Sequence, residues 1–80
     1  MTMEINVKDE MVMKLLHYFI TEKNYNPVVL HGAQEEIWLE NMDNEYKIVR
    51  IVSNYIHNNE QCQLFLLTYF IKLFVDYDKT

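Results

Sequence analysis

The chain has 80 residues, half of them apolar, with one glycine, one proline and one cysteine, which suffices for one small domain over residues 1–80 and not for two. Twelve acidic against seven basic side chains give a net charge of −5, which argues against nucleic-acid binding, because clustered lysine and arginine supply most of the affinity for phosphates. Since the single cysteine cannot form an internal disulfide, a reducing compartment fits the chain better than secretion.

The first expected element is an amphipathic helix over residues 7–23. Its apolar side chains recur at helical spacing, at Met11, Val12, Leu15, Leu16, Phe19 and Ile20. Asn6 is expected to cap the start of this helix, and Asn24 with Pro27 to end it.

Three strands are expected next, at residues 28–31, 36–41 and 46–52. The first is a short β-branched run that ends at Gly32, the second alternates around Trp38, and the third is again β-branched. Turn-forming residues at 41–44 separate the second and third strands. These features predict a three-stranded antiparallel meander, and with the flanking helices an α+β domain.

A second helix is expected over residues 55–75, with Ser53 and Asn54 as candidate caps. It carries one narrow polar stripe, made of Gln61, Thr68, Lys72 and Asp76. The rest of its surface is apolar, and that arc is too wide for one small sheet to cover. We therefore expect this helix to bind another protein or a second copy of the chain, with Leu66, Phe70 and Phe74 as contact residues; a membrane surface fits less well, because the polar stripe holds only one lysine.

Residue types used in covalent catalysis occur without the surroundings that catalysis needs. Ser53 is the only serine and lacks a glycine-flanked turn, so a capping role is expected. Cys62 and His57, five residues apart, fall on different faces of a helix. The histidines at 17, 31 and 57 lack the spacing of a metal pair. No catalytic residue and no cofactor are expected.

Acidic residues gather around the second strand and the turn after it. Glu36, Glu40 and Glu45 are the weak candidates for ligands of a divalent cation such as Mg²⁺ or Mn²⁺. Glu45-Tyr46-Lys47 also matches the E-x-K pattern of metal-dependent nucleases, although eight glutamates and six lysines make such a tripeptide common by chance. A small nuclease using Glu36, Glu45 and Lys47 is one alternative function.

Two segments, His31–Asn41 with its EEIWLEN string and Tyr46–Ile51, resemble the soluble N-terminal region of rhomboid-family intramembrane proteases of Gram-positive bacteria. Leu16–Phe19 and Asn24–Tyr25 also look like the first helix of that region and its exit. The resemblance covers about residues 10–60.

The resemblance implies a cytosolic accessory domain attached to the inner face of the cell membrane in the full-length protein. Its partner would be the membrane-embedded protease, which cuts substrates with a Ser–His pair in a Gly-x-Ser-Gly context. This chain has no such motif, so Ser53 does not inherit the role of the nucleophile. The other open alternative is a free-standing module that forms a homodimer through the C-terminal helix.

Overall fold

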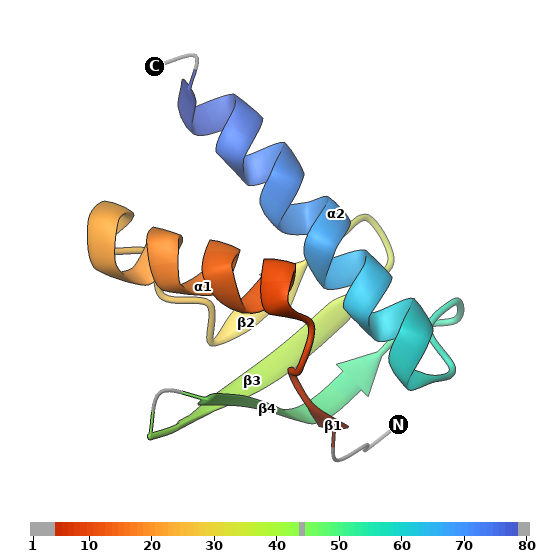
Figure 1. Ribbon diagram of the computed structural model, residues 1–80. Helices are drawn as coiled ribbons and strands as arrows, with labels where there is room; N and C mark the ends of the chain where they lie inside the picture. The colour runs from red at the N-terminus through yellow and green to blue at the C-terminus, as the bar shows by residue number, and fades with distance from the viewer. Residues whose placement is uncertain (1–4, 44, 79–80) are drawn as a thin grey trace.

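The computed structural model describes residues 5–43 and 45–78, which form two helices and four strands (Figure 1). In chain order these are β1 (Ile5–Asn6), α1 (Glu10–Lys23), β2 (Val29–His31), β3 (Glu36–Met42), β4 (Glu45–Val52) and α2 (Asn59–Asp78). The strands form one antiparallel sheet in the order β1-β4-β3-β2. The predicted α+β arrangement is therefore confirmed.

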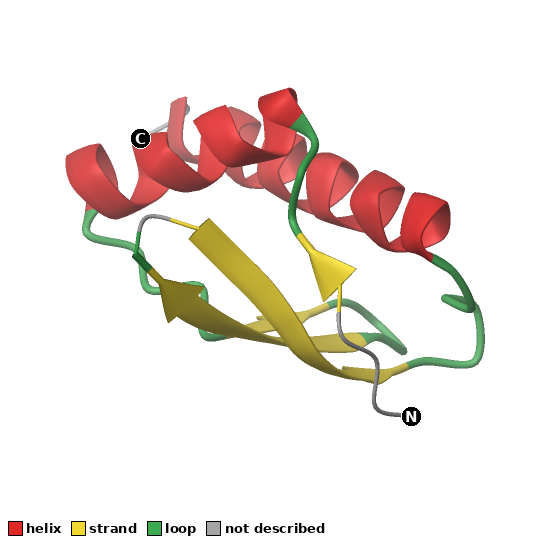
Figure 2. Cartoon of the chain, turned by 60° about the horizontal axis from the view of Figure 1, so that its bottom comes forward, coloured by secondary structure: helices red, strands yellow, loops and turns green. Residues whose placement is uncertain are grey.

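Both helices lie on the same face of the sheet, so the molecule has two layers and the other sheet face is open (Figure 2). The core lies between the layers, because alternate side chains of each strand point toward the helices. It is formed by Leu30, Ile37, Leu39, Ile48 and Ile51 from the sheet, Val12, Leu16 and Phe19 from α1, Cys62, Leu66 and Phe70 from α2, and Val7 and Ile56 from the connections.

The three predicted strands correspond to β2, β3 and β4, and Asn44 of the predicted turn lies outside the described residues. The structure adds β1, which pairs with β4 through Ile5 opposite Ile48 and Asn6 opposite Lys47. A strand of two residues is too short to show the alternation by which the longer strands were predicted. The meander is therefore extended at one edge into a four-stranded sheet.

The first helix begins three residues later than predicted, at Glu10. The predicted cap, Asn6, lies in β1, and the N–H of Val7 still donates to the Tyr46 carbonyl, at 2.9 Å. Asp9 caps the helix instead, because its Oδ1 accepts the backbone N–H groups of Met11 and Val12. Asn24 ends the helix as expected, in the left-handed conformation with φ 53°.

Replacing Asp9 with alanine is expected to lower the free energy of unfolding by about 1 kcal/mol, because two N–H groups of the first turn lose their acceptor. Urea denaturation followed by circular dichroism measures this change. Lys8→Ala is the control, since Lys8 is exposed and lies one residue before the cap. Equal unfolding midpoints for Asp9→Ala and Lys8→Ala would contradict the assignment of the cap.

The second helix also begins later than predicted, at Asn59 rather than residue 55. Ser53 caps a turn before it, where Ser53 Oγ accepts the N–H groups of Tyr55 and Ile56 at 2.9 and 3.0 Å. Asn58 Oδ1 accepts the N–H of Gln61 at 2.9 Å and so caps the helix itself. The weak helix formers between His57 and Asn59 account for the delay.

Candidate functional site

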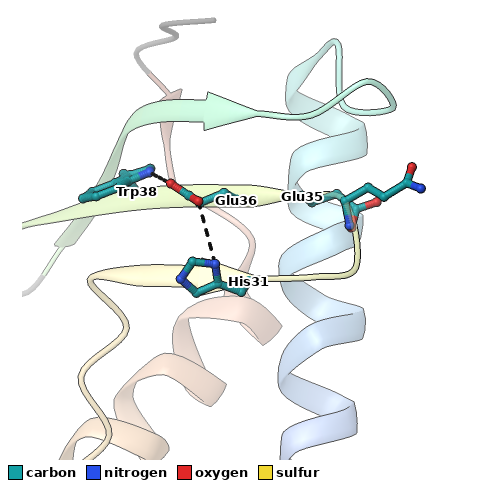
Figure 3. Close-up of polar contacts among 5 residues, drawn as sticks. His31, Glu35, Glu36 and Trp38 are labelled. Carbon is teal, nitrogen blue, oxygen red and sulfur yellow. Dashed lines mark hydrogen bonds and ion pairs between the residues drawn. The ribbon is translucent and has the colours of Figure 1, made fainter.

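The predicted acidic residues lie on the open face of the sheet. Glu36, Trp38 and Glu40 alternate along β3 with the buried Ile37 and Leu39, so they point away from the helices. Figure 3 shows Glu36 between two partners. Trp38 Nε1–H donates to one of its carboxylate oxygens, and His31 Nδ1 on β2 lies 3.8 Å from the other. Glu36 therefore already has contacts that orient it along the sheet.

The strand register separates Glu36 from the other two candidate metal ligands. Glu40 lies opposite Lys47, and Glu45 lies opposite Met42, which is six positions along β3 from Glu36. Six positions of a strand span about 20 Å, so Glu36 and Glu45 do not converge on one cation, as the nuclease hypothesis requires. Within residues 5–43 and 45–78, no three His, Cys, Asp or Glu side chains are grouped to hold a metal ion.

A bulge in β4 places an arginine over the tryptophan on this open face. Trp38 pairs with Arg50 and Leu39 with Ile48, so Val49 is the extra residue. The Arg50 guanidinium lies 5.9 Å from the centre of the Trp38 ring, a cation–π distance. The bulge lets both Ile48 and Ile51 reach the core. On the open face, Trp38 thus contacts both Glu36 and Arg50, and Glu36 also contacts His31.

The residues considered for covalent catalysis lie on several different elements and do not form a nucleophile–base pair among the described residues. Cys62 has no exposed surface, and burial raises the pKa of its thiol to about 11. A thiol of this kind is almost entirely protonated at neutral pH and is a poor nucleophile. Ser53 belongs to the turn before α2, and the histidines lie on α1, on β2 and in the turn preceding α2. The structure assembles no nucleophile with a base among the described residues.

Two of the three predicted contact residues of the C-terminal helix lie in the core. Leu66 and Phe70 have no exposed surface, so they are unavailable to a partner, and this part of the prediction is wrong. Phe74 is 42% exposed, and its ring centre lies 5.6 Å from that of Tyr18 on α1. The helix is covered by the sheet and by α1 together, and those two elements take the side that carries Leu66 and Phe70.

The side of α2 that remains open carries a different set of apolar residues. We call these four the outer stripe: Leu64, Ile71, Phe74 and Val75, which are 63, 49, 42 and 45% exposed. Leu64, Thr68, Ile71 and Val75 are spaced by four, three and four residues, the spacing of one seam of a helix pair. The buried residues Cys62, Leu66 and Phe70 follow a second row at intervals of four. Both rows can be recognised from their spacing in the sequence, but the sequence does not indicate which of the two faces the core.

Comparison of the chain with known protein families, with curated protein sequences and with solved structures finds no match. Neither described helix is long and apolar enough to cross a membrane. The outer stripe of α2 is a solvent-exposed apolar surface, whereas the described acidic residues of the sheet are not grouped as metal ligands and the Cys62 thiol is buried with a raised pKa.

Proposed function

We propose that this chain is a non-catalytic interaction domain, the cytosolic accessory part of a rhomboid-type intramembrane protease, which docks on that protease through the outer stripe of α2. The observation that carries the docking surface is the exposure of four large apolar side chains along one side of a helix whose other side completes the core. The proposal that the partner is a rhomboid-type protease is supported by the resemblance of residues 10–60 to the soluble N-terminal region of that family.

The size of the outer stripe favours a partner that is already held nearby. Full burial of one large apolar side chain stabilises by about 1.5–3 kcal/mol, so burying the exposed half of each of these four contributes about 1 kcal/mol. The total of about 4 kcal/mol on this side is comparable with the lower estimates of the cost of association. A freely diffusing partner would bind weakly, whereas a partner on the same polypeptide or membrane is present at an effective concentration in the millimolar range.

Leu64, Ile71 and Val75 of the outer stripe, with the polar Thr68 between them, have the spacing of a helix-pair seam, which favours one alternative, in which α2 pairs with α2 of a second copy. Two copies would bury both stripes and gain about twice the apolar free energy, which still predicts a dimer only near millimolar concentration. Sedimentation equilibrium between 10 µM and 1 mM distinguishes the two functions. A dimer that forms within this concentration range and is lost in Ile71→Ser would favour the second-copy alternative.

A photo-crosslinking experiment tests the proposed docking. The variants Ile71→Cys and Val28→Cys are labelled with a benzophenone maleimide; Ile71 and Val28 are 49 and 47% exposed, and Val28 lies away from the stripe, just before β2. Cys62 needs no replacement, because it has no exposed surface. The probe is a Gram-positive rhomboid protease without its own N-terminal domain, in detergent micelles. We expect crosslinks to the protease from position 71 and not from position 28.

Empty micelles are the control for attraction of the apolar stripe to detergent. Equal crosslinking from positions 28 and 71, or none to the protease from position 71, would overturn the proposed docking. Crosslinks between copies of the chain, in the presence and in the absence of the protease, would replace it with the homodimer.

A further inference from the structure

A groove of about 320 Å³ lies between α2 and the turn that follows β2. His31 and Gly32 line one wall, and one side of α2 forms the other. The volume is at the lower end of the range of small-molecule sites, roughly 300–1,000 Å³, and equals about ten water molecules at the volume they occupy in the liquid. A ligand of the size of one amino acid fits this space.

The apolar wall of the groove is held in place by the core behind it. The rings of Phe65 and Tyr69 are stacked, with centres 6.0 Å apart and planes 25° from parallel. The Tyr69 hydroxyl is 2.9 Å from the hydroxyl of Tyr25, which joins α2 to the end of α1. Tyr25 packs in turn on the ring of the buried Phe70. The groove therefore has two aromatic side chains in its wall, and their contact with each other and the contact of Tyr69 with Tyr25 fix their orientation before any ligand arrives.

The opposite wall approaches this surface closely because residue 32 is glycine. A Cβ on Gly32 would overlap Glu35 Oε2 and would lie 3.0 Å from Cε2 of Phe65. The turn is closed by the Gly32 N–H, which donates to the Glu35 carbonyl at 2.8 Å. The backbone of the turn thus faces the aromatic wall across the groove.

Two side chains of opposite charge, Lys72 and Asp76, lie at the rim of the groove. Lys72 and Asp76 are one turn apart on α2, and both line the groove. Neither forms an ion pair or hydrogen bond with any residue in the described part of the chain. Lysine placed four residues before an acidic residue is the weaker of the two helical orders. An exposed cation and an exposed anion therefore remain side by side above an aromatic surface.

We propose that this groove binds a zwitterionic aromatic amino acid, independently of the docking function of the outer stripe. Lys72 pairs with the carboxylate of the ligand, Asp76 pairs with its ammonium group, and the aromatic ring packs against the wall formed by Phe65 and Tyr69. A ligand with about twelve non-hydrogen atoms in a half-open groove is expected to bind with a Kd of about 1 mM.

A titration followed by ¹H–¹⁵N NMR tests this site, with L-phenylalanine and L-tryptophan as probes. We expect saturable shifts of the amide signals of Gly32, Phe65 and Lys72. The variants Lys72→Gln and Asp76→Asn each remove one charge at an exposed position and are expected to weaken binding at least fivefold. Lys14→Gln, at an exposed position on α1, is the matched control and is expected to bind like the unchanged protein.

Three related compounds test the chemistry of recognition: phenylacetate lacks the ammonium group, phenethylamine lacks the carboxylate, and L-alanine lacks the ring. Each is expected to bind at least fivefold more weakly than L-phenylalanine. Binding of phenylacetate or phenethylamine as tight as that of L-phenylalanine would overturn the zwitterion assignment. The site would be overturned if the amide signals showed no saturable shifts with either amino acid, or if Lys72→Gln bound L-phenylalanine as tightly as the unchanged protein. It would also be overturned if the shifts depended on the protein concentration and not on the ligand concentration.

Discussion

Replacing Phe70 with alanine is expected to lower the free energy of unfolding by about 3–5 kcal/mol, the usual effect of removing a buried phenylalanine. Phe70 has no exposed surface, and its ring is stacked on that of Phe19, with centres 5.6 Å apart. A domain of this length has a total stability of about 4–12 kcal/mol. The variant should therefore be close to unfolding at 25 °C, as urea denaturation followed by tryptophan fluorescence measures.

Phe74→Ala is the matched control, since it removes the same side chain one turn later on α2. Phe74 is 42% exposed and contacts Tyr18 at the edge of the helix pair, so a loss of no more than about 1.5 kcal/mol is expected. Equal losses in the two variants would mean that α2 is rotated relative to the sheet. The assignment of the outer stripe would then be wrong as well.

The second large effect is on the reactivity of Cys62 toward an aromatic disulfide reagent. With the thiol pKa raised to about 11, about one thiol in a thousand is ionised at pH 8, against roughly a quarter of an unperturbed thiol with a pKa near 8.5. Ionisation alone therefore slows the reaction by a factor of about 200, and burial blocks the reagent further. We expect the native protein to react at least ~100-fold more slowly than the protein in 6 M guanidinium chloride.

The pH dependence of this reaction shows the direction of the shift. The thiol is stabilised in its protonated form, so its reaction rate in the native protein should rise about tenfold per pH unit up to about pH 11. The rate in the unfolded protein should level off above about pH 9. Val28→Cys is the control for an exposed thiol. Native-state labelling of Cys62 at the rate seen for position 28 would contradict its burial.

The candidate sites were only partly predictable. The polar stripe of the second helix is visible in the sequence, and its members Gln61, Thr68, Lys72 and Asp76 are all exposed. The groove beside it could not be seen, because His31 and Gly32 lie more than thirty residues earlier in the chain. Likewise, the acidic residues of β3 and β4 were identified as neighbours in sequence, whereas the antiparallel register separates Glu36 from Glu45 along the sheet.

The sequence by itself determined the elements that depend on local patterns: the period of apolar residues in each helix, the alternation in the long strands, and the helix stop at Asn24. Only the tertiary structure decided which apolar row of α2 is buried, because a helix that is apolar almost all round has no preferred inner side until α1 and the sheet pack against it. The same holds for β1, since two residues acquire strand geometry through their hydrogen bonds to β4 rather than through a preference of their own.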